Sequence, residues 1–510
     1  MTSAARRPRD PWRVAAAALL ALACGAAGAQ GTVTPTLSGR IEYTSNVNLS
    51  PDDQREHDVI LSLTPGIAID YRAPRASLQG SFAVPLTYYA RASSSSRADV
   101  QAALRGSAEV LADLFFVDAS INVSQSYANP FGPRPDDITS ITENRQTSAT
   151  YRLSPYLQRR VGNYRYLLRD DLTWTRFYDS PFDEGTTYSN RLFGTVERDA
   201  TPYGWALDVY RDEYEFTDSR SEQLLERVRA RGIWQPSPLF SAYVTGGYER
   251  NRFPLTRYEG ETYGLGFTWR PTPRTNVDAN WEKRFFGDSY LFNLDHRTRL
   301  AVFRLRASRD ASSFPELLAQ VPEGTFVPGL LNELLVARIP DPQERAQFIV
   351  DYMSSRGLPL VLNAPLELYT TRITVIERAV ASVGLLGVRN SLFLSAFYSK
   401  STPVTASGTE IPPLVAQSLD NNTQVGGTAV WSYRLSGLSS LSLSGTVTRT
   451  RANDPFTDES TQRIARLTFT RRVSPWTSVF AGARWQDFES DFSRPWDEYA
   501  VYAGFNYRFH

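Results

Sequence analysis

Three arginines on one short stretch are the first side chains that could do chemistry. The stretch LLERVRARG carries Arg227, Arg229 and Arg231 at every second position, so in a β-strand all three guanidinium groups point the same way. Guanidinium groups that line a polar lumen select for anionic solutes or polymer. The preceding segment offers four carboxylates for cross-strand ion pairs instead, namely Asp208, Asp212, Glu213 and Glu215. We favour the ion pairs, and we keep solute contact as the second interpretation.

Enzyme chemistry has little to build on in this sequence. The three histidines are His57, His296 and His510, and their spacing matches no metal site. His296 follows Asp295 and lies near Ser289, a set that a hydrolase could use as base and nucleophile. A hydrogen-bonded polar cluster is the simpler interpretation. We therefore expect no catalytic residue, no cofactor and no metal.

The first residues, 1–29, predict a secretory signal peptide. Four arginines precede an apolar run from Val14, and Ala27-Gly28-Ala29 offers a small-x-small cleavage site. The run is shorter than the ~20 residues that a membrane-spanning helix needs. The only cysteine, Cys24, lies inside this signal, so cleavage near Ala29 leaves no thiol for disulfides or metal sites. A lipoprotein acylated at Cys24 is the alternative, but Ala21-Leu22-Ala23 has alanine where such signals usually carry leucine.

Charge and composition exclude two classes of protein. Cleavage near Ala29 removes four arginines and one aspartate, which changes the formal net charge from +1 to −2. A nucleic-acid-binding chain would keep a basic excess, so we expect no nucleic-acid partner. The chain has 510 residues, is 12 % aromatic, and has a negative mean hydropathy with no long apolar segment after the signal. A helical membrane protein is excluded, which leaves a large soluble all-β protein or a membrane β-barrel.

Alternating segments and alternating loop lengths favour the barrel. Segments of about ten residues such as VILSLTPGIAIDYR (59–72) and NSLFLSAFYSK (390–400) alternate in polarity along the chain. Short turns such as QPSP (235–238) take turns with long polar loops such as NPFGPRPDDITSITEN (129–144). Outer-membrane barrels place short turns on one rim and long loops on the other. We therefore predict that 30–510 forms an all-β, transmembrane, antiparallel outer-membrane β-barrel of roughly 20 strands, within a range of about 18–22.

Residues 311–365 break the strand pattern and predict a helical insert. Asp341 is placed to cap a helix with Pro342 at its first position, and Gly357 is placed to end it. A stripe on one face of this helix must be buried against a lumen wall, a lid at one rim, or a partner protein. The stripe consists of Phe348, Ile349, Tyr352 and Met353.

The insert also raises a question of topology. If the strands alternate in direction through residue 308, the short turn at 385–390 falls on the wrong rim. An unrecognised strand between 309 and 377 would correct this, and so would a chain crossing of the lumen. The sequence leaves both open.

The chain ends on a strand with the features of an assembly signal. Tyr502-x-Gly504-x-x-Tyr507-x-Phe509 resembles the terminal signal that the barrel-assembly machinery recognises in its clients. His510 follows Phe509, a departure of one residue from the usual aromatic end. An amphipathic edge strand is the alternative.

The first hairpin carries the most specific resemblance to a known family. Tyr43-Thr44-x-Asn46-Val47-x-Leu49, the later Asp58, and Pro65-Gly66-Ile67 resemble outer-membrane proteins associated with the exosortase (PEP-CTERM) sorting system and its exopolysaccharide gene clusters. GVRNSLFLSAFYSK (387–400), preceded by PDPQERAQFIVDYMSSRGLP (340–359), is similar to the second half of those proteins. The resemblance covers the whole mature chain.

The resemblance implies a role in passage or handling of exopolysaccharide, or in matrix assembly, at the outer membrane of a Gram-negative cell. It transfers no catalytic residues. The expected partners are outer-membrane lipid, the barrel-assembly machinery, and exopolysaccharide with its biosynthesis and export proteins. Our leading expectation is a non-enzymatic conduit or gate in exopolysaccharide export. A general diffusion porin for small solutes and a closed-lumen scaffold are the alternatives.

Overall fold

The computed structural model describes residues 30–137, 139–179, 185–217, 221–253, 257–313, 326–362, 365–366, 373–404, 419–491 and 493–509. The expected signal peptide, 1–29, lies outside the described residues, as does His510. None of the helices among these residues has the length and apolar character of a membrane-crossing segment.

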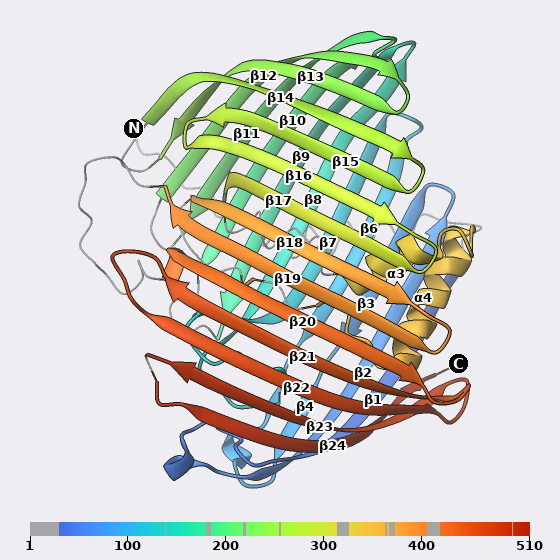
Figure 1. Ribbon diagram of the computed structural model, residues 1–510, viewed down its shortest axis with the longest axis vertical. Helices are drawn as coiled ribbons and strands as arrows, with labels where there is room; N and C mark the ends of the chain where they lie inside the picture. Colours follow the sequence, from blue (N-terminus) through green and yellow to red (C-terminus); the bar gives the residue numbers. More distant parts are fainter. Residues whose placement is uncertain are drawn as a thin grey trace, which may run out of the picture.

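Strands make up most of the described chain, and Figure 1 shows them side by side around a ring. The first half contains β1 (Gln30–Thr44), β2 (Asp58–Ala73), β3 (Ala76–Ala83), β4 (Leu86–Tyr89), β5 (Arg97–Ala98), β6 (Gln101–Leu111), β7 (Phe115–Tyr127), β8 (Arg145–Val161), β9 (Tyr164–Tyr178), β10 (Thr186–Arg198), β11 (Tyr203–Phe216) and β12 (Ser221–Ser237). The second half contains β13 (Phe240–Arg252), β14 (Arg257–Thr272), β15 (Thr275–Arg284), β16 (Gly287–Arg297), β17 (Ala301–Ser312), β18 (Thr374–Leu386), β19 (Asn390–Pro403), β20 (Asn422–Arg434), β21 (Ser439–Ala452), β22 (Glu459–Arg472), β23 (Thr477–Ser490) and β24 (Trp496–Arg508).

The strands pair antiparallel in chain order and close into a barrel. β1 pairs with β2 along one edge and with β24 along the other, where Thr36 lies opposite Arg508 and Thr44 opposite Ala500. β3 and β4 both pair with β2 and together form one interrupted barrel strand. β5 pairs with β4 and β6 pairs with β3, so β5 and β6 together form the next barrel strand. Pro85, which has no N–H to donate, lies at the break between β3 and β4. The described residues thus form a closed barrel of 22 strands, at the upper end of the predicted range.

The longest connections gather at one rim as the sequence predicts, although 285–286 at that rim is as short as a turn. Gln30 and Arg508 lie at the rim where short connections such as 162–163, 238–239 and 473–476 join the strands, which we call the turn rim. The opposite rim, which we call the loop rim, holds the long connections such as 45–57 and 128–144. Outer-membrane barrels place short turns in the periplasm and long loops outside the cell, which orients the molecule.

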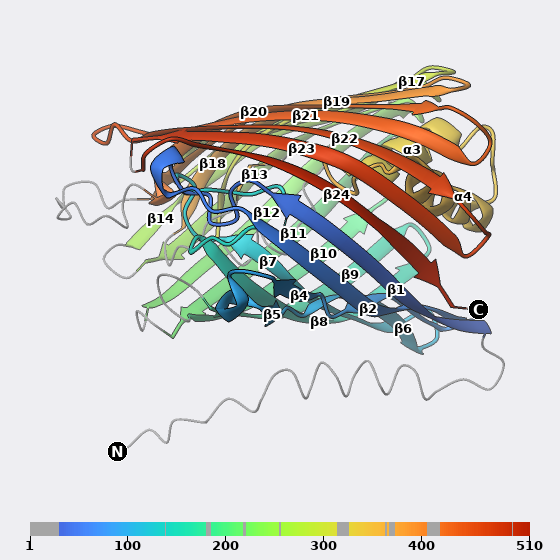
Figure 2. The same cartoon turned by 90° about the horizontal axis from the view of Figure 1, so that it is seen from below.

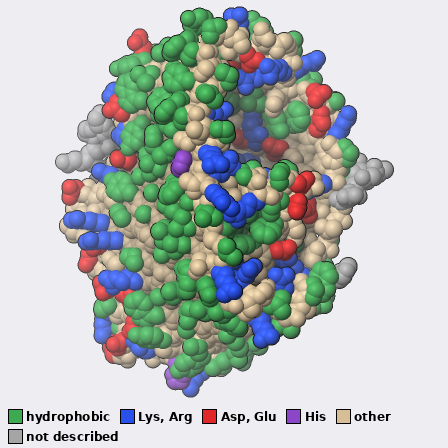
Figure 3. Space-filling view, turned by 45° about the vertical axis from the view of Figure 1, so that its right-hand side comes forward, with side chains coloured by type: hydrophobic (Ala, Val, Ile, Leu, Met, Phe, Trp, Pro, Cys, Tyr) green, Lys and Arg blue, Asp and Glu red, His purple; other side chains and the backbone are tan. Residues whose placement is uncertain are grey.

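An apolar band covers the outside of the barrel. Figure 3, which brings the turn rim forward, shows apolar side chains over the wall and a hollow at this rim. In each strand these side chains alternate with residues that face inward. Exposed members of the band include Val33, Ile41, Leu61, Val209, Val228, Val244, Leu265, Val447, Val501 and Phe505. An apolar outer face on a closed sheet fits lipid, because the sheet leaves no unpaired edge. The fold is therefore a transmembrane β-barrel of the outer-membrane type.

The predicted insert contains two helices, α3 (Val327–Leu335) and α4 (Pro342–Arg356). The Asp341 side chain caps α4, since it accepts hydrogen bonds from the backbone N–H groups of Gln343 at 2.7 Å and Glu344 at 2.8 Å. Gly357 ends the helix with φ of 59°, a left-handed conformation that glycine adopts without strain. Both ends of α4 thus agree with the sequence.

The insert settles the question of topology in favour of a chain crossing. Ser312 lies opposite Thr374 in the β17–β18 ladder, and both residues are at the loop rim. The helices lie inside the barrel at the other end, with the C-terminus (Figure 2). At that end the guanidinium of Arg297 donates to the carbonyl of Glu333, and Arg356 donates to the carbonyl of Arg389. The chain therefore leaves the wall at the loop rim after β17, forms α3 and α4 at the turn rim, and re-enters the wall at the loop rim in β18.

Candidate functional site

The lumen is the candidate functional site, and two segments of the chain occupy part of it. One is the loop between β7 and β8, residues 128–144, which we call the lumen loop; Ile138 within it lies outside the described residues. The other is the helical insert. Their contacts with the wall decide how much of the lumen stays open.

The lumen loop folds inward from the loop rim and lies on the wall formed by β1 and β22–β24. The side chain of Gln462 on β22 donates to the carbonyl of Arg134 at 2.5 Å. Ser460 and Ser490 donate to the carbonyls of Pro130 at 3.4 Å and Phe131 at 3.3 Å. These contacts join positions more than 300 residues apart in the sequence. The loop is thus a packed element of the lumen.

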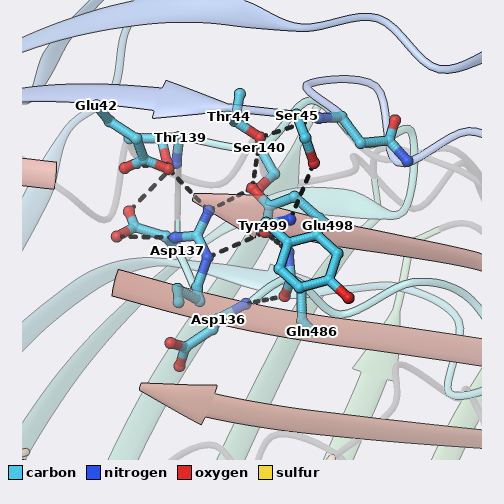
Figure 4. A network of polar contacts seen from close by, with 12 residues as sticks. Glu42, Thr44, Ser45, Asp136, Asp137, Thr139, Ser140, Gln486, Glu498 and Tyr499 are labelled. Atoms are coloured by element: carbon cyan, nitrogen blue, oxygen red, sulfur yellow. Dashed lines mark hydrogen bonds and ion pairs between the residues drawn. The ribbon is translucent and has the colours of Figure 1, made fainter. Parts of the chain in front are cut away.

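A cluster of buried charges holds the tip of the lumen loop. Arg484 on β23 is fully buried and bonds Glu42 on β1 at 2.8 Å and Glu498 on β24 at 2.7 Å. Asp137 of the loop pairs with Arg40 on β1 and lies 3.6 Å from Arg484. Figure 4 shows the carboxylates of Glu42, Asp137 and Glu498 brought together from β1, the loop and β24. The cluster joins the loop to the strands at which the barrel closes.

Further hydrogen bonds and a second ion pair extend this cluster. Gln486 donates to Glu498 at 2.8 Å and accepts from the backbone N–H of Asp136 at 3.3 Å (Figure 4). The Asp136 carboxylate pairs with Arg466 on β22 at 2.5 Å. Thr44 donates to Glu498 at 2.6 Å. Buried charges are costly unless they are paired, and each charged group of this cluster has an ion-pair partner.

Asp137 is the charged group of the loop that depends most on this arrangement. Burial raises its pKa, but the guanidinium groups of Arg40, Arg484 and Arg466 lower it by more, and the result is a pKa lowered to about 2. The carboxylate is therefore ionised across the physiological range, and its charge favours the inward position of the loop.

The helical insert covers the wall at the turn rim. Leu330, Leu331 and Leu334 of α3 and Ile349 and Met353 of α4 are buried against each other and the wall. The wall contributes Val302, Leu386, Phe393 and Val430 to this cluster. Beyond α4, Leu366 lies against β20, where its backbone N–H donates to the Gln424 side chain at 2.9 Å.

One part of the predicted stripe on α4 is wrong. Ile349 and Met353 are buried, but Phe348 is 42 % exposed, and its ring stacks on Tyr352 at 5.9 Å. The buried face instead includes the stems of Arg345 and Arg356. The aliphatic part of an arginine side chain can cover apolar surface as an aromatic ring does. A prediction that counts only apolar residues therefore assigns the wrong buried face to α4.

The three arginines of the sequence prediction lie on β12 on the inward face, and all three have carboxylate partners. Arg229 and Arg231 bond the buried Asp208 of β11 at 3.0 Å and 2.8 Å. Arg227 pairs with Glu282 of β15 at 3.2 Å, a partner that the sequence did not indicate. The favoured ion-pair interpretation therefore holds for Asp208. Solute contact by these arginines stays a prediction.

The polar trio around His296 does not assemble. Asp295 and His296 are successive residues of β16 and so lie on opposite faces of the sheet. The Asp295 carboxylate pairs with Arg304 at 2.8 Å and Arg306 at 3.0 Å, while His296 lies 2.9 Å from the Thr275 hydroxyl. Within the described ranges, no three histidine, cysteine, aspartate or glutamate side chains group as a metal ion requires.

The described residues leave one side of the lumen uncovered. On β3, β6 and β7 the inward residues Gln79, Arg105 and Asn122 are exposed, although they lie inside the ring of strands. Gln79 lies directly opposite Arg105 in the ladder. They line a cavity of about 790 Å³ together with Asp118 and Arg152. We call this wall the open wall, and sequence reasoning missed it because it depends on where the two inward segments pack.

The residues of the predicted assembly signal lie on β24. Tyr502 faces the lumen, where it is 7 % exposed and bonds the Thr468 hydroxyl at 2.7 Å. Gly504 lets Phe480 approach, since a Cβ there would meet that ring at 2.5 Å. Phe509, which is 42 % exposed, has the parity of the outward face. Recognition by the assembly machinery stays a prediction.

Comparison with known proteins places the fold. No protein-family model and no curated protein matches the sequence. The FrpB iron transporter from Neisseria meningitidis (F5-1 variant) superposes with a TM-score of 0.51 at 8 % identity, over 93 % of this chain and 82 % of that one. The siderophore receptor PirA from Acinetobacter baumannii gives 0.47 at 10 % identity, over 93 % and 80 % of the two chains. At these identities the likeness to FrpB shows the barrel fold alone.

Proposed function

We propose that this chain is a non-enzymatic outer-membrane conduit of an exopolysaccharide export system, in which the lumen loop and the helical insert narrow the passage. The barrel fold supplies the channel. The link to exopolysaccharide and to the PEP-CTERM sorting system rests on the resemblance of the first hairpin and of 387–400 to proteins of such systems.

The observation that carries the proposal is the open wall. Gln79, Arg105 and Asn122 are exposed inside the barrel, so the inward segments leave a polar path beside them. A filled lumen would have buried these side chains. Exposed polar groups on a lumen wall suit a hydrated solute such as a sugar chain, because they replace its water contacts.

The packing of the insert supports a narrowed conduit over a general porin. α3 and α4 share an apolar cluster with the wall, and this cluster fixes them at the turn rim, through which an exported chain would enter. A general porin has no need of this cover. A closed-lumen scaffold would need the open wall covered as well.

The first test is the conductance of the mature chain in a planar bilayer, with and without the insert. Residues 313–373 are replaced by a short Gly-Ser turn, which joins Ser312 to Thr374, two residues that already lie opposite each other. The barrel wall is thereby left intact. Removal of residues 52–54, three exposed residues of another long loop, serves as the control, since none of them lines the cavity at the open wall.

We expect a small current from the intact barrel, and an increase of about twofold or more when the insert is absent, because 22-stranded lumens conduct freely only without their plug. The control should match the intact barrel. Equal, steady current from the intact and shortened barrels would favour the general porin. Silence from both would favour the scaffold.

A further inference from the structure

A second large cavity lies in the lumen beside the lumen loop, and its lining extends to Ser126 and Tyr127 of β7. It lies between the lumen loop and the described part of the chain after α4, residues 357–362 and 365–366, against β20–β23. Its volume is about 840 Å³, within the ~300–1,000 Å³ of small-molecule binding sites. We call it the hydroxyl pocket.

Hydroxyl groups line the wall of this pocket in rows. They stand at alternate positions, so all face inward. β21 contributes Ser442, Ser444, Thr446 and Thr448, and β22 contributes Thr468 and Thr470. Phe480 adds an aromatic face. Rows of hydroxyls beside an aromatic ring match a sugar, which presents hydroxyls at its edge and C–H groups on its face.

The charges that line the pocket have a positive excess. Arg40, Arg134 and Arg466 line it, against the single carboxylate of Asp136. Arg40 and Arg466 are paired with Asp137 and Asp136 of the lumen loop. Arg134 has no carboxylate within ion-pair distance among the described residues.

The loop holds Arg134 in place without neutralising it. Its carbonyl accepts from Gln462, and its guanidinium donates to the Thr450 hydroxyl at 3.1 Å. Burial lowers the pKa of Arg134 to about 10, which still leaves the side chain charged at neutral pH. A partly buried cation without a carboxylate partner is costly for the fold, and an anionic ligand would reduce that cost.

We propose that the hydroxyl pocket binds a carboxylated sugar unit, with the Arg134 guanidinium on the carboxylate and the β21 and β22 hydroxyls on the sugar hydroxyls. This inference rests on the proposed function and narrows its substrate to an acidic polysaccharide. Guanidinium and carboxylate match in geometry, which makes the contact specific as well as strong.

The test is calorimetric binding to the folded mature barrel in detergent, with trigalacturonate as the acidic probe and maltotriose as the neutral one. We expect trigalacturonate to bind at least about tenfold more tightly than maltotriose, and Arg134→Gln to remove at least about tenfold of that affinity. Arg134→Lys should lose less, since it keeps the charge. Arg160→Gln, at an exposed arginine of β8 that lines neither this pocket nor the open wall, should bind as the wild type does.

Equal affinity of the wild type and Arg134→Gln for trigalacturonate would overturn the proposal, as would equal affinity for the two probes or no binding at all. Heat-modifiable migration on a gel verifies that each variant is folded, and Arg134→Lys keeps the test valid if Arg134→Gln does not fold. Calorimetric binding does not depend on ion current, so the binding test and the conductance test are independent. A conducting barrel that fails here refutes the pocket alone, and a barrel that binds but does not conduct refutes the conduit.

Discussion

Replacement of Asp137 by asparagine should release the lumen loop. The change keeps the size of the side chain and removes the charge that faces Arg40, Arg466 and Arg484. Three guanidinium groups would then face a neutral amide in a site that is largely buried. Because Asp137 is the loop's own contribution to the buried cluster, the barrel strands keep the Arg484 pairs with Glu42 and Glu498.

The size of the effect follows from the pKa of Asp137, which is lowered from an ordinary 3.8 to about 2. A folded-state pKa below the unfolded value means that the carboxylate stabilises the fold above pH 3.8, and that this stabilisation is lost as pH falls toward 2. The difference corresponds to about 2 kcal/mol, or a shift of roughly 30-fold in the equilibrium between inward and released loop.

Single-channel recording measures this equilibrium as the fraction of time spent at a higher conductance level. We expect Asp137→Asn to raise that fraction about 30-fold at pH 7, and the wild type to approach the variant as the pH falls from about 4 to 2. Asp136→Asn is the matched control, because Asp136 is 31 % exposed against 12 % for Asp137 and its pair is weakened by water. Equal occupancy of the higher level in Asp137→Asn and wild type at pH 7 would refute this account of the loop.

Two further predictions concern stability. Arg484→Met removes the cation that two buried glutamates share and should lower the free energy of unfolding by about 3–5 kcal/mol in a denaturant titration. Arg508→Met, at an exposed pair, should change that free energy by less than about 0.5 kcal/mol, and equal midpoints for the two variants would contradict the role of the cluster. Asp341→Ala removes the cap of α4 and should cost the helix about 1 kcal/mol, seen as roughly fivefold faster amide exchange over 342–356. Gln347→Ala, on the exposed side of α4, should leave exchange unchanged, and a protected α4 in the Asp341 variant would count against the cap.

Much of the barrel could be predicted because its rules are local. A period of two fixes which side chains face lipid, and the alternating loop lengths fix the two rims without any contact information. The cap of α4 is equally local, since Asp341, Pro342 and Gly357 act within one helix. The strand number was less certain, because β4 and β5 have 4 and 2 residues and continue strands already counted.

The occupation of the lumen could not be predicted, because it depends on distant contacts. The lumen loop has the composition of an exposed loop, rich in proline and aspartate, yet Asp136 and Asp137 bond residues that are 97 to 350 positions away. A weak signal was present, since Glu42, Arg484 and Glu498 are charged residues on the inward parity of the strands at which the barrel closes. Parity shows that such residues face inward, but not which of them meet.

The motif of the first hairpin gains a physical meaning from the structure. Asn46 is fully buried, and its amide donates to the carbonyls of Ser50 at 2.7 Å and Asp497 at 3.0 Å. Asp58 is buried and accepts from the backbone N–H groups of Arg91 and Ala92, both at 3.0 Å. These two residues shape the loop rim beside the point where β1 meets β24. A structural role therefore explains why Asn46 and Asp58 belong to the motif, and this role requires no contact with a solute.

The most direct test of the conduit is modification of a single cysteine on the open wall while current is recorded. The mature chain that we expect has no cysteine, so Asn122→Cys would be its only thiol. Attachment of a bulky charged thiosulfonate reagent at Asn122→Cys should reduce the current. The same treatment of Ile121→Cys should not, because the side chain at position 121 points to the opposite, lipid-facing side of β7. A current that is unchanged after complete modification at Asn122→Cys would contradict a passage along the open wall.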